Sequence, residues 1–343
     1  MPDLRTIWRP EFYHGRGRRP PFFEGWYFKL VDASEQHRYA VIPGIFIGHE
    51  PGASHAFVQT LDGATGRTAY HRYPFEAFQA ARDEFDIRVG PNRFRADRIE
   101  LDIDRPEGRM AGELRFAGGA PWPVTLTSPG IMGPYAFAPF MECYHGVLSF
   151  DHEISGGLTV DGGTFDFTGG RGYIEKDWGQ AFPKAWIWTQ SNHFGEAAAG
   201  TCLTASVAII PWLRGAFPGC IVGLRHGGQL YRFATYTGAV TERLDLTDTH
   251  VTWQMTGRAG PRNTPHRLGI VAWRAEGGLL HSPERAVMLQ RVLESLTARL
   301  EVRLLAVSSG QEQVIFEGTG RHAGLEIVGP IDEIQKMARG EGS

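Results

Sequence analysis

Short apolar segments recur along most of this chain, and turn-forming dipeptides separate them. Asp62-Gly63, Gly90-Pro91 and Gly118-Gly119 are such breaks, because these residue types favour the tight turns that join antiparallel strands. Aromatic residues make up 12% of the 343 positions, as is usual for strands that pack on a core. Strands recurring every ~8–12 residues predict an all-β chain. Only the segment after Pro330, Ile331–Ala338, has the amphipathic pattern of a short helix.

The expected strands form two series of similar length. The first series is Phe22–Val31, Tyr39–Ile47, His55–Leu61, Tyr70–Phe78, Phe85–Val89, Asn92–Ile103, Gly112–Phe116 and Trp122–Thr127. The second is Met141–Phe150, Gly157–Val160, Thr164–Thr168, Glu175–Phe194 with a break at Gly179 and Pro183, Thr201–Ile210, Gly219–Arg225, Gln229–Thr237, Thr249–Met255, His266–Arg274, Arg299–Val307, Glu312–Gly318 and Gly324–Val328. The spacing of apolar residues in Glu284–Leu296 fits a helix as well as a strand.

The segment Ser128–Phe140 contains three prolines and two glycines, which exclude a regular interior element. We therefore predict two β domains packed side by side and joined by this segment. Each series also contains an acid close to a tryptophan, Glu24-Gly25-Trp26 and Asp177-Trp178-Gly179, which indicates a faint internal duplication. The predicted order is an irregular lead-in (1–21), a first β domain (22–127), the connection (128–140), a second β domain (141–330) and a helical tail (331–343).

Composition excludes several classes of function. A net charge of −3 and a pI near 6.5 argue against binding to nucleic acid or to an anionic membrane. The sequence has no apolar run of the ~18 residues that a membrane span requires, and its N-terminus lacks the apolar stretch of a secretion signal. Three cysteines fit a reducing compartment, so we expect a cytoplasmic protein.

Common catalytic motifs are also absent from the sequence. It contains no Gly-x-Ser-x-Gly elbow, no phosphate-binding glycine loop and no His-Glu-x-x-His pair. Its thirteen histidines are scattered, which predicts no metal centre. Cys143 and His145 share one strand face, where a small buried cysteine beside a hydrogen-bonded histidine is the favoured interpretation over a reactive thiolate pair.

The stretch Gly172–Phe194 carries the most chemical information. Alternation along a strand places Trp186, Trp188, Gln190 and Asn192 on one side. Two indoles beside two amides make an unusual core, because buried amides need hydrogen-bond partners. They also suit the wall of a pocket for an apolar ligand with one polar end, and both interpretations stay open.

Four acids lie in apolar sequence: Glu24, Glu142, Glu175 and Asp177. Each has a structural alternative, in which it caps backbone amides or pairs with a basic residue. For Glu175 a functional role is slightly favoured. A carboxylic acid that donates a proton near neutral pH needs a pKa raised from ~4.3 to about 7, and burial among aromatic residues can supply such a shift.

These residues also carry a resemblance to a known family. Tyr173-Ile-Glu-Lys-Asp-Trp-Gly179, Phe182-Pro183 and Trp186-Ile-Trp-Thr-Gln-Ser-Asn-His-Phe194 resemble the hallmark block of the tocopherol cyclases. Phe23-Glu-Gly-Trp-Tyr-Phe28 resembles that family's opening motif, and Phe316–Thr319 with Ala323–Glu326 its closing pattern. The resemblance spans roughly residues 22–330 and indicates a divergent, bacterial-type member. More distantly, the chain is similar to carotenoid hydratase-like proteins, which implies two lipocalin-like antiparallel β-barrel or sandwich domains.

The resemblance implies cyclisation of a prenylated hydroquinone to a chromanol, of the vitamin E type, by an intramolecular lyase or isomerase without a cofactor or metal. A general acid would protonate the prenyl double bond, indoles would stabilise the cation, and amides would orient the hydroxyl groups. The implied catalytic residues are Glu175, Asp177 and Glu24; the implied substrate-binding residues are Trp26, Tyr173, Trp178, Trp186, Trp188, Gln190, Asn192 and His145.

Two other functions remain open at this point. An isoprenoid hydratase would use the same acid with water as the nucleophile, and a non-catalytic carrier would only hold an apolar ligand. In each case the expected partner is an apolar small molecule, such as a prenylquinol or another isoprenoid, and not a nucleic acid. Pro211–Leu213 and Gly215–Phe217 are predicted to be exposed and apolar, which suits transient contact with a membrane surface.

Overall fold

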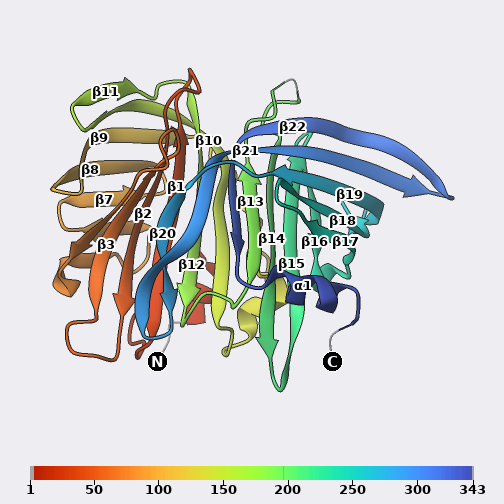
Figure 1. The fold of residues 1–343 in the computed structure, drawn as a ribbon, viewed down its shortest axis with the longest axis horizontal. Helices are drawn as coiled ribbons and strands as arrows, with labels where there is room; N and C mark the ends of the chain where they lie inside the picture. Colours follow the sequence, from red (N-terminus) through yellow and green to blue (C-terminus); the bar gives the residue numbers. More distant parts are fainter. Residues whose placement is uncertain (1–3, 196, 342–343) are drawn as a thin grey trace. The chain divides into compact units, whose positions relative to one another are not determined.

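The computed structural model describes residues 4–195 and 197–341 (Figure 1). In this part of the chain, strands dominate, and the helices are four 3-10 turns, η1 (Leu4–Trp8), η2 (Phe75–Ala77), η3 (Gly133–Phe137) and η4 (Thr235–Thr237), and one α-helix, α1 (Ile331–Ala338). Its contacts divide it into two compact units. Unit 1 extends to Phe182 and includes Gly278–Arg291; unit 2 contains Pro183–Gly277 and the chain from Val292 onwards.

Unit 1 is built on an antiparallel sheet whose strands follow the order β4-β3-β2-β1-β12-β10-β9-β8-β7-β6-β5, with β11 paired to β10. One hydrophobic core joins Val41 and Val58 near one end of this order to Ile87 and Leu101 near the other, so the sheet curls around its core. The strands are β1 (Phe22–Val31), β2 (Arg38–Ile47), β3 (His55–Asp62), β4 (Thr68–Tyr73), β5 (Phe78–Ala80), β6 (Asp86–Val89), β7 (Asn92–Arg95), β8 (Arg98–Arg105), β9 (Gly108–Ala117), β10 (Cys143–Val160), β11 (Gly163–Asp166) and β12 (Gly170–Gly179).

The second antiparallel sheet has the order β16-β15-β14-β13-β22-β21-β19-β18-β17. It encloses its own core, in which Ile187, Val222 and Trp253 are buried, and α1 contributes Ile331 and Ile334. The strands are β13 (Trp186–Ser191), β14 (Cys202–Trp212), β15 (Gly215–His226), β16 (Gln229–Ala234), β17 (Val240–Leu246), β18 (His250–Ala259), β19 (Thr264–Trp273), β20 (Gly278–Glu284), β21 (Val287–Ser308) and β22 (Gln311–Val328). Of these, β20 and the first residues of β21 belong to unit 1. There the backbone N–H of His281 on β20 donates to Gln59 Oε1 at 2.7 Å, and Gln59 Nε2 donates to the His281 carbonyl at 3.2 Å.

The all-β prediction is confirmed, and the bounds expected for β1 and α1 agree with the structure. One of the predicted strands is wrong. Trp122–Thr127 forms only an isolated bridge, since Pro121 and Pro123 have no N–H groups to donate to a ladder. Val240–Leu246 is a strand that the sequence pattern did not reveal. Of the helix and the strand left open for Glu284–Leu296, the structure has the strand: β20 ends at Glu284, and β21, which starts at Val287, pairs with β20.

The boundary between the units also differs from the predicted one. β10 and β12, expected in the second domain, pair with β9 and β1 in the first sheet, so the chain divides after Phe182 and not at 128–140. The proline-rich segment is a loop of unit 1, with Ile131 and Met132 buried. The two acid-and-tryptophan motifs are neighbours on β1 and β12, with Glu24 opposite Trp178 and Gly25 opposite Asp177, so they are not one copy per domain.

A buried ion pair ties the N-terminal lead-in to the sheet of unit 1. The Lys176 ammonium lies 2.6 Å from Glu24 Oε1 and also donates to the carbonyls of Pro10 and Phe12. The backbone N–H of His14 donates to both oxygens of Glu24, at 2.9 and 3.0 Å. Neither charged side chain is exposed, and a charge in such a position is tolerated only when it is paired and hydrogen-bonded.

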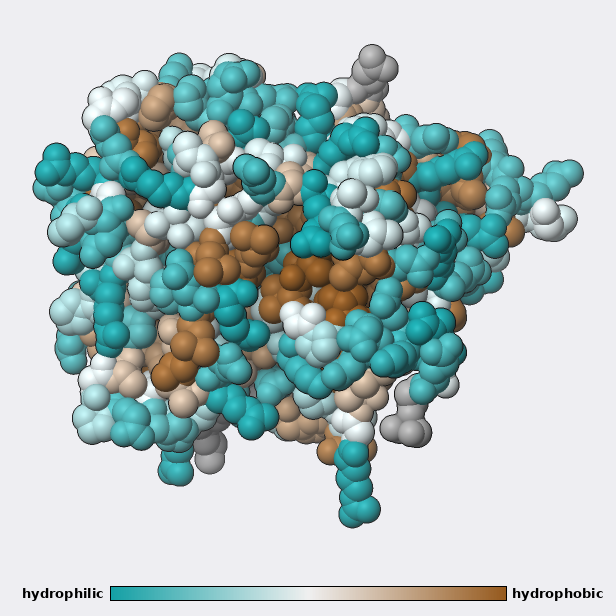
Figure 2. Space-filling model, in the orientation of Figure 1, coloured by the Kyte–Doolittle hydropathy of each residue, from teal (hydrophilic) through white to brown (hydrophobic). Residues whose placement is uncertain are grey.

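Most of the surface seen in Figure 2 is hydrophilic, with apolar residues gathered in a few patches. The predicted apolar hairpin lies at the turn between β14 and β15, where Leu213 is 84% exposed and the Trp212 and Phe217 rings meet edge to face. Its contact with a membrane surface stays a prediction. Within the described residues, no helix is long and apolar enough to cross a membrane.

Replacing Lys176 by methionine should destabilise the protein strongly, because Glu24 is then left buried and charged without its cation. We expect the free energy of unfolding to fall by about 3–5 kcal/mol, measured by denaturant titration. The surface variant Lys184→Met, which loses only an exposed pair with Glu333, should change it by less than about 1 kcal/mol. Adding Glu24→Gln to Lys176→Met should restore part of the loss. Equal effects of Lys176→Met and Lys184→Met would contradict this account.

The stability that Glu24 contributes should depend on pH. Burial is the largest single influence on the pKa of Glu24 and acts to raise it, but the Lys176 charge and the hydrogen bonds from His14 and Lys176 together lower this pKa. A carboxyl with a lowered folded-state pKa stabilises the protein above its unfolded pKa of ~4.3 and loses that effect as the pH falls through the folded value. The difference in unfolding free energy between wild type and Glu24→Gln should thus shrink as the pH falls below about 5. A difference that stays flat down to about pH 3 would refute the assignment.

Candidate functional site

Three adjacent strands of unit 1, β1, β12 and β10, present different side chains on their two faces. Trp26 and Phe28 on β1 and Ile174 on β12 point into the core of unit 1, on what we call the inner face. Because successive residues of a strand alternate, Tyr27, Glu175 and their same-parity neighbours lie on the opposite, outer face. The outer face is nevertheless buried here: Tyr173 and Lys29 are 0% exposed and Glu175 is 5% exposed.

Four outer-face residues form what we call the acid–imidazole cluster: His145, Tyr173, Glu175 and Asp177. Tyr173, Glu175 and Asp177 follow one another at two-residue spacing on β12, and His145 lies directly opposite Asp177 on β10. Antiparallel pairing therefore places an imidazole beside two carboxylates that are far from it in sequence.

The hydrogen bonds of the acid–imidazole cluster run in a line. His145 Nδ1 lies 2.8 Å from Asp177 Oδ1, so the carboxylate accepts the Nδ1 proton and holds the ring. The other ring nitrogen, Nε2, then faces Glu175 Oε2 at 3.6 Å, and the Tyr173 hydroxyl donates to the same oxygen at 2.5 Å. Glu175 can therefore exchange a proton with His145, and its hydrogen bond from Tyr173 fixes its orientation.

The same groups could hold a metal ion. His145, Glu175 and Asp177 each offer one ligand atom, and these atoms lie within 4.8 Å of one another, the one such group among the described residues. The short contact between His145 and Asp177 is that of a hydrogen bond, which occupies both atoms with each other. This geometry favours proton transfer, and the expected absence of a metal stays a prediction.

Cys143 lies on the same face as His145, with its thiol 4.0 Å from Asp177 Oδ1. Burial, followed by the negative charges of Asp177 and Glu142, raises the pKa of this thiol, so it is a neutral thiol rather than a thiolate. This favours the structural interpretation of the Cys143–His145 pair.

Three of the predicted site residues lie away from the acid–imidazole cluster, on the inner face. Glu24 is paired with Lys176, which favours its structural alternative. The ammonium of Lys176 lies 4.8 Å from the ring centroids of both Trp26 and Trp178, so these indoles stabilise a buried cation of the protein itself. Trp178 also stacks on His14 at 4.2 Å. These contacts favour a structural role for Glu24, Trp26 and Trp178.

The remaining four predicted residues belong to unit 2. Trp186, Trp188 and Gln190 on β13 have the parity opposite to Ile187, which packs in the core of that unit, and the two indoles are 5% exposed. Trp186 Nε1 donates to Glu326 Oε2 at 2.6 Å. The Trp188 ring lies over Gly324, where an added Cβ would come within 2.6 Å of it. Asn192 follows β13 and contacts His193 Nδ1 at 3.0 Å.

Some chemically notable residues were not identified from the sequence. Glu294 is fully buried on β21 and lies opposite Glu326 on β22 in unit 2. The segment around Glu294 had no clear periodicity, so its face could not be assigned. Lys29 lies on the outer face with Tyr27, and the alternation of residues along Phe22–Val31 could have assigned it to that face.

The tautomer of His145 offers a direct test of the acid–imidazole cluster. In the wild type, His145 should be almost entirely the tautomer with the proton on Nδ1. Asp177→Ala removes the acceptor of that proton, so the fraction of this tautomer should fall. Histidine 15N chemical shifts measure the two tautomers separately. Asp166→Ala, which removes an exposed carboxylate bonded to Thr168, is the control and should leave the His145 signals unchanged. An unaltered His145 spectrum in Asp177→Ala would mean that Asp177 does not hold the ring.

Comparison with known proteins identifies the family of this chain. The sequence profile of the tocopherol cyclase-like family matches residues 125–329, which include the whole acid–imidazole cluster and β13. The chloroplastic tocopherol cyclase of Zea mays is 28% identical over 203 residues, 57% of this chain and 41% of the maize protein. This chain thus matches less than half the length of its curated relatives.

Solved structures share the fold. The crystal structure of CghA aligns with a TM-score of 0.53 at 13% identity, over 90% of this chain and 89% of CghA. A candidate AttH from Nitrosomonas europaea aligns with a TM-score of 0.50 at 14% identity, over 90% and 93% of the two chains. These likenesses concern the fold alone. The family profile, which covers more than half of the residues, shows that the chain belongs to the tocopherol cyclase-like family.

Proposed function

We propose that this protein closes a ring on a prenylated hydroquinone or a similar isoprenoid. A proton adds to the prenyl double bond and leaves a tertiary cation, the phenol oxygen forms a C–O bond to that carbon, and the phenol proton is released to a base. The product is a chromanol-type ring with the same atoms as the substrate, so the reaction is an isomerisation. Membership of the tocopherol cyclase-like family and the acid–imidazole cluster together support this proposal.

Glu175 is the proposed proton donor. It is buried on the outer face, with its Oε2 atom 3.6 Å from His145 Nε2. The Tyr173 hydroxyl binds one oxygen of Glu175 and restricts its rotation. A donor held in place before the reaction loses less entropy when it meets the double bond.

His145 is the proposed group that returns the proton. With its Nδ1–H bound to Asp177, the neutral imidazole presents the Nε2 lone pair toward Glu175. It can accept the phenol proton or share it with Glu175, which restores the acid for the next turnover. Asp177 is a positioning residue in this scheme, since it contacts His145 and stabilises the imidazolium form.

The line Asp177–His145–Glu175–Tyr173 is the observation that carries the proposal, because a carrier needs no aligned acid and base. A hydratase would use the same line with water as the nucleophile, and it remains the second candidate. The predicted roles of Trp186, Trp188, Gln190 and Asn192 in substrate binding stay predictions about unit 2. The cytoplasmic location also stays a prediction.

Glu175→Gln should abolish most of the activity, because glutamine keeps the shape of the side chain and cannot donate the proton. Incubation of a prenylated hydroquinone with wild type should give a chromanol of unchanged mass, detected by liquid chromatography and mass spectrometry. We expect the variant to lose about 10²–10⁴-fold in rate, the usual contribution of a general acid. Glu153→Gln, at an exposed position on β10, is the matched control and should retain full activity.

Isotopes separate the three functions. In D₂O the cyclase should add one deuterium to the prenyl carbon, and in H₂¹⁸O it should add no ¹⁸O, whereas a hydratase would add one ¹⁸O. A chelator such as EDTA should leave the rate unchanged if the acid–imidazole cluster works by proton transfer. Recovery of the same unaltered lipid from wild type and Glu175→Gln would favour the carrier and would return Glu175 to a structural role.

A further inference from the structure

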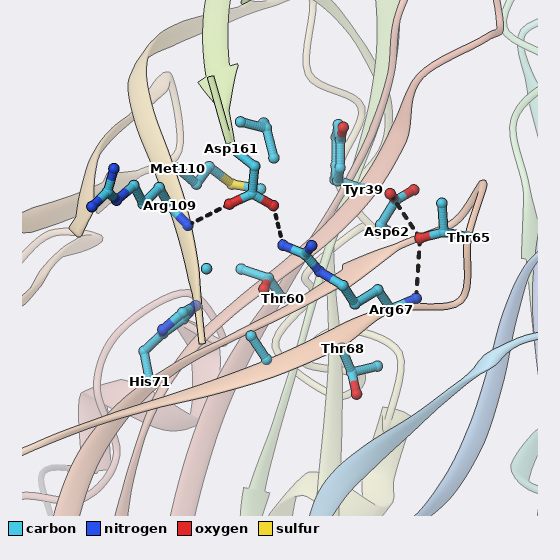
Figure 3. A pocket seen from close by; sticks show the side chains of 13 residues that line it. Tyr39, Thr60, Asp62, Thr65, Arg67, Thr68, His71, Arg109, Met110 and Asp161 are labelled. Carbon is cyan, nitrogen blue, oxygen red and sulfur yellow. Dashed lines mark hydrogen bonds and ion pairs between the residues drawn. The ribbon is translucent and has the colours of Figure 1, made fainter. Parts of the chain in front are cut away.

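A cavity of about 180 Å³ opens among residues of unit 1 (Figure 3). None of the residues that line it belongs to the acid–imidazole cluster. Its wall comes from inner-face residues: Tyr39 on β2, Thr60 on β3, His71 on β4, Met110 on β9 and Val160 on β10. Arg67 and Asp161 stand at its rim. Strands far apart in the sheet order thus meet around one opening, as a curled sheet requires.

His71 is the feature of this cavity that needs explanation. Its side chain is 3% exposed, and among the described residues its Nδ1 has no hydrogen-bond partner. A buried polar nitrogen without a partner destabilises the folded state, so native proteins rarely leave one without a reason. Burial is also the main influence that lowers the pKa of His71, which keeps the imidazole neutral with one donor and one acceptor nitrogen. A ligand group that both donates and accepts would satisfy it.

Most charged groups at the rim already have partners. Arg67 forms an ion pair with Asp161, whose carboxylate also accepts the Arg109 backbone N–H at 2.8 Å. Figure 3 shows the Arg67 side chain extended to this carboxylate. Asp62 accepts the Thr65 hydroxyl at 2.9 Å. An anionic ligand would meet two carboxylates, and a cationic one would have to displace Arg67, so the rim favours a neutral ligand.

The inner wall suits a small ring or a short chain that carries a hydroxyl group. Burial, followed by the charges of Asp62 and Asp161, raises the pKa of Tyr39 to about 12, so its phenol stays neutral and can donate or accept. Met110 is 4% exposed and supplies apolar surface together with Val160. A cavity of ~150 Å³ is known to hold one benzene molecule, so the volume here suffices for a single ring with a hydroxyl group.

We propose that this cavity is a second binding site, for a small neutral hydroxyl compound of the size of phenol. Its hydroxyl group hydrogen-bonds to His71, and its apolar body packs against Met110 and Val160. The site does not depend on the proposed cyclase activity, because it opens on the inner face of the sheet whereas Glu175 lies on the outer face.

Gly108 provides a way to close the cavity without disturbing the fold. A Cβ added there would lie 3.5 Å from Arg67 Nη2 and 3.9 Å from both Asp161 Oδ1 and His71 Cε1, which are ordinary van der Waals distances. The backbone of Gly108 is outside the left-handed region, so other residues adopt it without strain. A leucine at this position projects between the rim and His71.

Titration of phenol into the full-length protein, followed by calorimetry and by the 15N signals of His71, tests the proposal. Wild type should show saturable binding that shifts the His71 signals. Gly108→Leu and His71→Phe should each weaken binding at least about tenfold, as expected when a hydrogen bond or the space for the ligand is lost. Gly215→Leu is the matched control, since it adds the same side chain where nothing lies within 4 Å, and should bind phenol like wild type.

Benzoate, which has the same ring but a negative charge, should bind at least about tenfold more weakly than phenol. Three results would each overturn the proposal: no saturable binding of phenol to wild type up to about 10 mM, binding that leaves the His71 signals unmoved, or equal affinity in wild type and Gly108→Leu. Circular dichroism of each variant establishes that it is folded, and the measurements on wild type decide the matter even if a variant is not.

Discussion

The antiparallel pairing of β1 with β12 supports both the fold of unit 1 and its candidate site. β12 lies between β1 and β10 near the middle of the sheet, although it is last of the twelve strands in sequence. Its residues alternate between the two faces, so Lys176 points to the inner side while Glu175 and Asp177 point to the outer side. A shift of this pairing by one residue would exchange the two faces of β12. Lys176 would then point away from Glu24, and Glu175 and Asp177 would point away from the outer face.

The Glu24–Lys176 pair makes that register hard to change. Two charges removed from water are stable only with close geometry and further hydrogen bonds, which Pro10, Phe12 and His14 supply from the lead-in. A slipped register would separate the charges and leave each one buried without a partner. The ion pair on the inner face thus helps to hold the acid–imidazole cluster together on the outer face.

Unit 1 also shows how one curled sheet can present two chemically different candidate sites. The outer face carries two carboxylates around an imidazole, an arrangement suited to moving a proton. The inner cavity has a neutral imidazole, neutral hydroxyl groups and paired rim charges, an arrangement suited to holding a small neutral molecule. The chemical difference between the outer face and the inner cavity follows from the alternation of residues along the strands and from which charged groups are paired, rather than from different kinds of residue.

The sequence by itself determined the all-β class, the bounds of β1 and α1 and the family, because turn residues, alternation and local motifs are properties of neighbouring residues. The tertiary structure alone decided that β12 joins the first sheet, which moved the boundary of the units to Phe182 and made Glu24 a partner of Lys176. It alone brought His145 between Asp177 and Glu175, and His71 to the cavity near Gly108. Strand order and register depend on contacts between residues that are distant in sequence, and no local pattern specifies them.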